Sequence, residues 1–235
     1  MSERHPRVGF VTALEMERSW LGDSSDFEVV VCGMGRQRAE NAARQLVARG
    51  VDGIVSWGIA GGLDSALDAG TVVLADRVLR TDGSTIASDD AWRRRLTETI
   101  DGHVSVSTGS IFHSDEVLTS VENKRRTKEQ WAAVAVDMET GAIAAVAAES
   151  GLPWLAVRVV TDTASMGLPS AVTATSGADG RLRPAAIMKL VLCPWIWPDL
   201  ARLAGSSRAA ARSMRRLWSL AGPNLAMAPA AGSER

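Results

Sequence analysis

Carboxylate side chains recur just after short apolar runs of this sequence, and carboxyl groups are well suited to acid–base chemistry. The acids in such positions are Glu15, Glu17, Asp137, Glu139 and Asp162. Two glycine-rich stretches, residues 33–35 and 58–62, follow two further runs in the same way. If the runs are strands of an open α/β sheet, these positions share the edge outside the carboxyl ends of the strands, where ligands bind. Their convergence predicts a functional site.

The apolar runs are short, rich in Val and Ile, and bounded by Gly, Asp or Ser, which is typical of buried strands. They are Val8–Thr12, Val29–Cys32, Ile54–Trp57, Thr71–Ala75, Val104–Ser107, Val134–Met138 and Leu155–Val160. Helical spacing of apolar residues predicts helices over Gln37–Arg49 and Glu139–Ser150. Strands that alternate with helices predict a single α/β domain with a mixed, largely parallel central sheet flanked by helices.

Each candidate taken alone also has an ordinary structural explanation. Glu15 and Glu17 could favour the dipole of a helix in its first turn, and Glu139 or Asp162 could cap one. The glycine stretches could be tight connections, and Gly33–Gly35 lacks the third glycine of a dinucleotide fingerprint. His113 is equally consistent with a surface or internally satisfied histidine. Only the joint occurrence of these features predicts a site.

Composition bounds the class of protein. The 235 residues are 46% hydrophobic and 23% charged, which suffices for one large domain with a full core. A net charge of −1 gives no pull toward nucleic acid, and Tyr is absent. Cys32 and Cys193 lie in apolar runs, which favours thiols in a reducing compartment. No signal peptide is visible, and the apolar stretch at 190–197 contains Pro194 and is too short to span a bilayer. We expect a cytoplasmic protein, with the inner face of the membrane as an alternative location.

The charge is unevenly distributed along the chain. Residues 177–235 carry nine basic and three acidic side chains, a net charge of +6, against −7 for the remainder. The expected organisation is therefore an α/β core over 1–176 and a helical extension over 177–235 packed on it. Within these residues we expect a loop or lid over Ser165–Arg183, helices over Pro184–Leu192, Pro198–Ala204 and Ser206–Leu220, and a frayed end over Gly222–Arg235.

The last of these helices places four arginines on one face, Arg208, Arg212, Arg215 and Arg216. Together with the Trp195–Trp197 run, this face suits a helix that lies on an anionic bilayer surface. The alternative is an ordinary solvated face of a helix that packs on the core.

The order of the motifs resembles the nucleoside phosphorylase and nucleosidase superfamily, and most of all its methylthioadenosine/S-adenosylhomocysteine nucleosidases. The resemblance covers about Val8 to Ser165 and is carried by Ala13–Glu17, Cys32–Gly35, Trp57–Leu63, Val136–Ala142 and Val157–Asp162. Beyond it, Met166–Pro169, Asp179–Pro184 and the arginine-rich helix resemble the hopanoid-associated branch. That branch is implied to act on adenosylhopane, a nucleoside joined to a polycyclic lipid.

The resemblance implies a role for each matching residue in cleavage of an N-glycosidic bond. Asp162 would be the general acid at purine N7, with a pKa raised by burial. Glu17 would deprotonate the attacking water, and Glu139 would accept hydrogen bonds from the ribose hydroxyls. The remaining substrate contacts would come from Met138, Val117, Leu118, Ile59, Ala60, Gly61 and Thr161. No cofactor is implied, and no His/Cys cluster with ligand spacing predicts a metal. A homodimer is implied, with the segment Arg80–Phe112 as the partner-facing loop.

Two positions depart from the phosphorolytic relatives. Those enzymes hold phosphate with an arginine and a serine where this chain has Ser56 and Ile59. We therefore expect water rather than phosphate as the acceptor. Phosphorolysis stays open, because Arg36, Arg38 or Arg158 could supply charge from elsewhere. A non-catalytic nucleotide-binding or membrane adaptor is a weaker alternative, since it has no use for unpaired acids. A dinucleotide dehydrogenase is weaker still, since the sequence lacks the third glycine of its fingerprint and a ribose-binding acid at the expected distance.

Overall fold

The structure, a computed structural model, describes residues 5–23, 25–167 and 197–229. It contains eight strands, which account for every predicted apolar run. They are β1 (Val8–Thr12), β2 (Phe27–Val31), β3 (Gly53–Gly62), β4 (Val72–Leu79), β5 (Thr85–Ala87), β6 (Val106–His113), β7 (Ala135–Asp137) and β8 (Trp154–Asp162). The short hairpin strand β5 was not predicted, because its three residues are exposed or half-buried and carry no apolar run.

The strands form one mixed, largely parallel sheet, as predicted. β3 lies at its centre and pairs in parallel with β1 and β8, and β2 extends the sheet beyond β1. β8 pairs with β4, β4 with β6, β6 with β7, and β7 returns to pair with the last two residues of β3. Five strands, β3, β8, β4, β6 and β7, therefore close into a ring.

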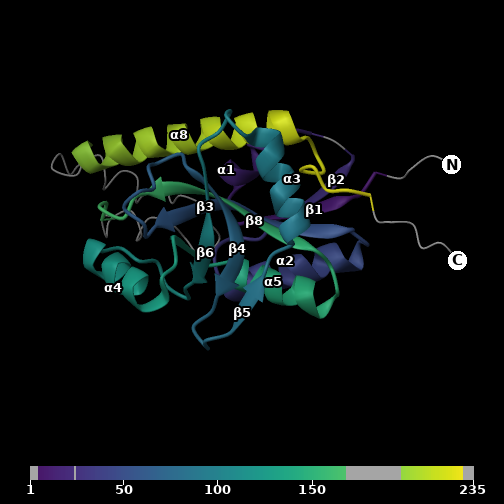
Figure 1. Ribbon diagram of the computed structural model, residues 1–235, viewed down its shortest axis with the longest axis horizontal. Coiled ribbons are helices and arrows are strands. Elements are labelled where there is room, and N and C mark those ends of the chain that lie inside the picture. Colours follow the sequence, from purple (N-terminus) through teal and green to yellow (C-terminus); the bar gives the residue numbers. More distant parts are fainter. Residues whose placement is uncertain (1–4, 24, 168–196, 230–235) are drawn as a thin grey trace, which may run out of the picture.

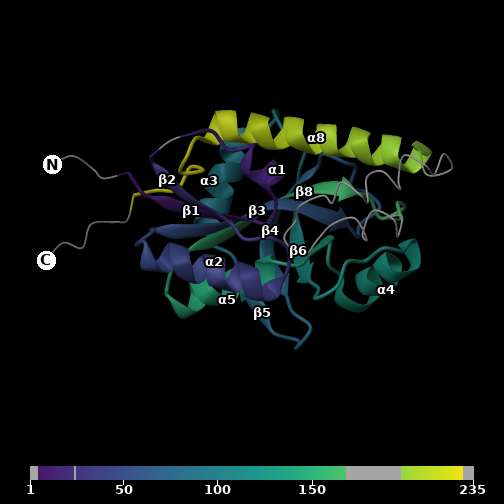
Figure 2. The same ribbon diagram turned by 180° about the vertical axis from the view of Figure 1, so that it is seen from behind.

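Helices cover both faces of the sheet (Figure 1). The helices α2 (Arg36–Ala48) and α5 (Thr140–Glu149) lie on one face, while α3 (Asp90–Ile100) and α8 (Trp197–Ala221) lie on the other. The view from behind shows the same two layers, with α4 (Val121–Trp131) apart from both (Figure 2). The single turn α1 (Glu15–Arg18) follows β1 directly. The predicted fold class is confirmed.

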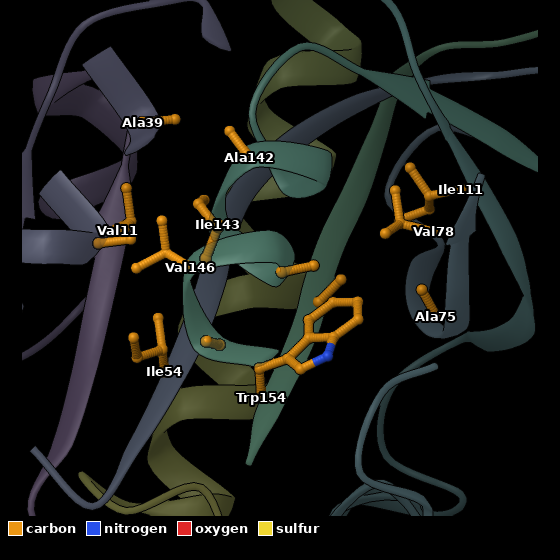
Figure 3. Close-up of a cluster of buried hydrophobic side chains, with 14 of the residues drawn as sticks. Val11, Ala39, Ile54, Ala75, Val78, Ile111, Ala142, Ile143, Val146 and Trp154 are labelled. Carbon is orange, nitrogen blue, oxygen red and sulfur yellow. The ribbon is translucent and has the colours of Figure 1, made fainter. Parts of the chain in front are cut away.

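The larger core lies between the sheet and the α2–α5 pair (Figure 3). Ile143 and Val146 of α5 point toward Val11 and Ile54 on the sheet, and the indole of Trp154 packs beneath them (Figure 3). Alanines at 39, 42 and 43 let α2 approach closely. This dense packing fixes the N-terminus of α5, which carries part of the site described below.

The helix α8 packs on the opposite face through a narrow apolar stripe. Ala210, Met214 and Leu217 are fully buried there. The four arginines at 208, 212, 215 and 216 are exposed on its outer side. The Trp218 ring packs edge-on with the rings of Phe10, Phe27 and Trp57, so this tryptophan belongs to the core. Within the described part of the chain, no helix has the length and hydropathy needed to cross a membrane.

Several local expectations were wrong. The stretch 58–62 continues β3 rather than forming a turn, and Arg80–Phe112 contains β5, α3 and most of β6 rather than a loop. The first residues of the segment expected to be frayed, 222–235, are packed on the core. Leu225 is buried, and its carbonyl accepts a hydrogen bond from the Trp92 indole at 2.8 Å. The two predicted helices over 198–204 and 206–220 form one continuous helix. The predicted helix 184–192, residues 168–183 of the predicted lid, and Trp195 lie outside the described residues.

Candidate active site

The buried charges of the described chain gather in one region. The side chains of this kind are Glu17, Lys124, Asp137, Glu139, Arg158 and Asp162. Glu17 lies on α1, Lys124 on α4 and Asp137 at the end of β7, and Glu139 directly precedes α5. Arg158 lies in the middle of β8, and Asp162 is its last residue. Because burial of a charge is costly unless it is paired, their concentration near the ends of β3, β7 and β8 makes this region the candidate active site.

Arg158 on β8 is the centre of the first half of the site. Its Nη2 lies 2.6 Å from Asp137 Oδ2 and 3.2 Å from Glu139 Oε2, and all three side chains are buried. Its Nε donates to Thr140 Oγ1 at 3.2 Å. Asp137 also accepts from the Thr140 backbone N–H and hydroxyl, which fixes it at the N-terminus of α5. The guanidinium therefore compensates two carboxylates at once.

Glu139 contacts both Arg158 and the glycine stretch that follows β2. Its Oε1 accepts the backbone N–H of Gly35 at 3.0 Å. Gly35 has a φ of 104°, a conformation that glycine adopts readily and that turns the chain toward Glu139. Burial raises the pKa of Glu139 to about 7, against the lowering effect of Arg158. A carboxylate held in this way can still accept hydrogen bonds from a ligand through its remaining lone pairs.

Glu17 is held by backbone donors rather than by a salt bridge. Its Oε2 accepts the N–H groups of Ala13 and Leu14 at 2.8 and 2.9 Å, and its Oε1 accepts that of Ile59 at 2.9 Å. Burial raises the pKa of Glu17, while Arg158 and these N–H groups lower it. The side chain is thus fixed in orientation and electrostatically poised to take up a proton.

Strand β3 passes between Glu17 and Arg158 at Gly58, where a side chain would not fit. A Cβ at this position would lie 2.4 Å from Glu17 Oε1 and 2.5 Å from Arg158 Nη1. The absence of that carbon lets the carboxylate and the guanidinium approach the strand from opposite neighbours. The glycines of 58–62 are therefore required by close approach within a strand.

Asp162 ends β8 and forms the second half of the site. Its Oδ2 lies 2.6 Å from Lys124 Nζ, and its Oδ1 accepts the Thr161 hydroxyl at 3.2 Å. Burial raises the pKa of Asp162, and the Lys124 ammonium lowers it. A Cβ at Gly61 would lie 3.0 Å from Asp162 Oδ2. A glycine on β3 therefore makes room for this acid as well.

The structure brings Glu17 and Glu139 together around Arg158, but Asp162 is separate from them. None of the hydrogen bonds or ion pairs of the described residues joins Asp162 to either glutamate. Gly58 and Gly61, which adjoin the two halves, are three residues apart on β3, a spacing of about 10 Å. The two halves thus lie along one strand at a separation comparable to the size of a nucleoside.

Of the other predicted contacts, Ile59 and Thr161 hydrogen-bond with these acids. Ile59 supplies the N–H that holds Glu17, Ala60 is buried, and Thr161 is buried beside Asp162. Met138 and Leu118 are half-buried, and Val117 is 41% exposed. Ser56 donates to or accepts from Thr140 Oγ1 at 2.8 Å, so this position supports the Arg158 cluster.

Two site residues were missed as such from the sequence. Arg158 was considered only as a source of charge for phosphate, and Lys124 was not singled out, because it stands among the charged residues of a helix that looks solvated.

The buried ring of His113 has no hydrogen-bond partner on either nitrogen among the described residues. Burial lowers the pKa of His113, and Asp115 Oδ1 lies 4.0 Å from its Nε2.

A cavity of about 550 Å³ lies next to the Asp162 half of the site. It opens between the segment 163–167, which follows Asp162, and the first half of α8. Small side chains of α8 and Met166 form its walls, with Arg202 beside them. None of the six buried charges lines it, so it adjoins the acids rather than containing them.

The model of the Phosphorylase superfamily matches residues 26–189, and this chain belongs to that family. Among curated proteins it is similar to the 5′-methylthioadenosine/S-adenosylhomocysteine nucleosidase of Mycobacterium tuberculosis, with 28% identity over 182 residues, 60% of this chain and 71% of that protein. The enzyme of the same name from Staphylococcus aureus is 27% identical over 167 residues, 62% of this chain and 73% of that protein.

Solved structures share the fold. A 5′-methylthioadenosine/S-adenosylhomocysteine nucleosidase from Neisseria meningitidis, in complex with methylthio-immucillin-A, has a TM-score of 0.70 and 18% identity, covering 94% of this chain and 98% of that one. The futalosine hydrolase of Helicobacter pylori has a TM-score of 0.67 and 17% identity, covering 93% of this chain and 99% of that one.

Proposed function

We propose that this protein hydrolyses the N-glycosidic bond of a 5′-substituted adenosine and releases adenine. The observation that carries the proposal is a set of three buried acids: Glu139, which pairs with Arg158, Glu17, which is held by backbone N–H groups, and Asp162 at the end of β8. Membership of the Phosphorylase superfamily and similarity to adenosine nucleosidases support the same reaction.

In the proposed reaction, the bond between ribose C1′ and purine N9 breaks and its electron pair stays on the base. Asp162 donates a proton to N7, so that adenine leaves as a neutral molecule. Water adds to C1′ and gives a proton to Glu17. Glu139 accepts hydrogen bonds from the ribose hydroxyls, and its negative charge favours the cationic ribosyl transition state.

The remaining contacts would enclose the nucleoside. Met138 would pack under the ribose, and Val117 and Leu118 would lie along the purine. Ile59, Ala60, Gly61 and Thr161 would form the floor beneath the glycosidic bond. The exposure of Val117 is consistent with a surface that a ligand covers.

The charge of the site supports water as the acceptor. The six buried charged groups comprise four acids and two bases, an excess of negative charge when all are ionised. Arg158 already binds Asp137 and Glu139, so it is committed to carboxylates. A phosphate dianion would therefore meet repulsion without a free cation among these groups. Phosphorolysis that yields a ribose 1-phosphate is the alternative.

The test is release of adenine from 5′-methylthioadenosine, S-adenosylhomocysteine and a 5′-alkyl adenosine, each with and without phosphate. We expect release in phosphate-free buffer and its loss in Asp162→Asn and in Glu17→Gln. Strict dependence on phosphate would establish the phosphorylase instead. Full activity of Asp162→Asn would remove the proposed acid.

For the 5′ substituent we propose a polycyclic lipid, with adenosylhopane as substrate and ribosylhopane and adenine as products in hopanoid biosynthesis. The resemblance of the segments 166–169 and 179–184 to the hopanoid-associated branch supports this choice. The exposed arginines of α8 suit peripheral binding to an anionic bilayer, from which such a substrate would be drawn. The similarity to methylthioadenosine/S-adenosylhomocysteine nucleosidases favours the small thioether nucleosides as the alternative substrates.

Competition and flotation distinguish the two substrates. An adenosine that carries a bulky polycyclic 5′ group should be cleaved with a higher kcat/KM than 5′-methylthioadenosine. The protein should float with vesicles that contain anionic lipid at low salt, and replacement of the four α8 arginines by Gln should abolish flotation. Faster cleavage of the thioether and no flotation would favour the small substrates.

We further propose a cytoplasmic homodimer whose partner subunit covers the open side of the site, and a C-terminal extension that is part of the same domain. Met16, Val117 and Val121 are large apolar residues exposed near the site, as expected for a surface that another chain covers. Sedimentation velocity tests the dimer, and a monomer at micromolar concentration would contradict it.

A further inference from the structure

Helix α4 buries a lysine instead of an apolar stripe. Lys124 is the one residue of α4 that is buried, with 1% of its surface exposed, while the other residues of this helix are half-buried or exposed. Most helices are held to a domain by apolar side chains. Here the helix sends an ammonium group into the interior at the end of β8.

The Lys124 ammonium is surrounded by oxygen atoms. Its Nζ lies 2.6 Å from Asp162 Oδ2, and it donates to the carbonyls of Asp162, Thr163 and Met166 at 3.1, 2.8 and 3.0 Å. An ammonium has three protons, so these four acceptors use all of them. No donor remains for a ligand, and the lysine acts on its surroundings through Asp162 and the segment that follows it.

We propose that Lys124 is the positioning residue of the Asp162 acid, which it orients toward the leaving base and whose carboxylate it stabilises once the proton has been transferred. The inference rests on the proposed function. When the C1′–N9 bond breaks and Asp162 gives its proton to N7, a carboxylate forms in a buried site. The ammonium at 2.6 Å compensates that new charge, so the acid loses its proton more readily in the transition state.

Through its three carbonyl contacts, Lys124 also holds the backbone around Asp162 in place. They fix the backbone from Asp162 to Met166, and hence the direction in which β8 delivers the carboxyl group. Gly61 leaves the space that this direction requires, since a Cβ there would lie 3.0 Å from Asp162 Oδ2. Orientation and charge compensation thus come from one side chain on a separate helix.

The experiment compares leaving groups that need a proton with one that does not. Lys124→Met should lower kcat for the adenine nucleoside cleaved fastest by the wild type by about 10²- to 10³-fold, the contribution of a general acid. Cleavage of para-nitrophenyl riboside, whose leaving group departs without protonation, should fall less than about threefold on the same reasoning. Lys124→Arg keeps the charge and should recover part of kcat.

The pH profile is a second readout that a purely structural lysine would not move. Without the ammonium, the pKa of Asp162 rises, so the alkaline limb of kcat should move to higher pH in Lys124→Met. Lys128→Met is the matched control on the same helix: Lys128 pairs with Asp64 at the half-exposed surface, 2.8 Å away, and its loss should leave both substrates and the profile unchanged.

Each outcome decides one question. Equal loss for both leaving groups with an unmoved alkaline limb would make Lys124 structural and overturn the inference, while adenine release by the wild type would still support the proposed function. Failure of the wild type to release any base from adenine nucleosides would overturn the proposed function itself. If Lys124→Met does not fold, the ratio of the two rates is decided on Lys124→Arg, which keeps the charge but changes the geometry. Its partial loss of kcat should be larger for the adenine nucleoside than for para-nitrophenyl riboside, and an equal loss for both would overturn the inference.

Discussion

Arg158 Nη2 lies 3.2 Å from Glu139 Oε2 in the interior, and the same nitrogen lies 2.6 Å from Asp137. One cation thus holds two carboxylates, one from the end of β7 and the other from the residue that caps the N-terminus of α5. The arrangement joins the strand β8 to the helix α5 by charge as well as by packing. It also leaves the second Glu139 oxygen on the side of Gly35, away from the arginine.

Arg158→Met should therefore be strongly destabilising. Removal of the guanidinium leaves Asp137 and Glu139 buried without their cation, at a cost of about 3 to 5 kcal/mol in the free energy of unfolding. Urea denaturation at neutral pH measures it. Arg77→Met, which removes a surface arginine paired with Asp76, should leave the transition nearly unchanged. Equal effects of the two substitutions would contradict the importance given to the buried pair.

Gly58→Ala should reduce activity more than stability. The new methyl group would meet Glu17 Oε1 at 2.4 Å and Arg158 Nη1 at 2.5 Å, so one or both must move from the site. A misplacement of about 1 Å can cost about 10²-fold in rate. The matched control is Gly205→Ala in α8, where the added carbon meets open space and helix propensity predicts a gain of about 1 kcal/mol. Steady-state kinetics that show an unchanged kcat for Gly58→Ala would be inconsistent with this view of β3.

The pKa of Glu139 predicts a pH dependence of stability. Burial raises this pKa from 4.5 to about 7 in the folded state, so between these values the folded protein binds more protons than the unfolded chain. The free energy of unfolding contributed by Glu139 therefore falls as pH rises through this window. In Glu139→Gln this fall is absent, so the stability of the variant relative to wild type should increase from pH 5 to pH 8. The increase is at most about 1.4 kcal/mol for each pH unit between the two pKa values, the slope for a single proton.

Glu122→Gln is the control for this measurement. Hydrogen bonds from Arg125 and Arg126 lower the pKa of this exposed glutamate, so its linkage lies below pH 4.5. The difference between Glu122→Gln and wild type should be flat from pH 5 to pH 8. A flat difference for Glu139→Gln as well would mean that Glu139 titrates at an ordinary pH in the folded protein.

The strands could be predicted from the sequence because burial on both faces makes them continuous runs of apolar residues. β1 agrees residue for residue, and β8 was placed to within two residues. The glycines at 58–62 misled the prediction of where β3 ends, since glycine is usually a signal for a turn. In this chain their function is to make room for Glu17, Arg158 and Asp162, which no local pattern reveals.

The helices α3 and α4 could not be predicted from periodicity. Their sequences, Asp90–Ile100 and Val121–Trp131, are dominated by charged residues. α3 buries only Trp92, Leu96 and Ile100, and α4 buries a lysine. The acids of the site were found because they follow strands, whereas the cations that hold them, Arg158 inside a strand and Lys124 on a charged helix, become visible only once burial is known.

Trp218 joins helix α8 of the C-terminal extension to the core. Trp218 packs edge-on with three aromatic rings of the sheet face, at centroid distances of 5.1 to 6.3 Å. Trp218→Ala removes these contacts from a half-buried position, and we expect a loss of about 3 kcal/mol in the free energy of unfolding. If α8 belongs to the domain, urea unfolding followed by fluorescence and by circular dichroism should remain a single coincident transition that moves as a whole. Substitution of the four exposed arginines of α8 by Gln should leave that transition in place, because their side chains lie in solvent. A separate early transition for α8, or no effect of Trp218→Ala, would show that the extension is an appendage rather than part of the core.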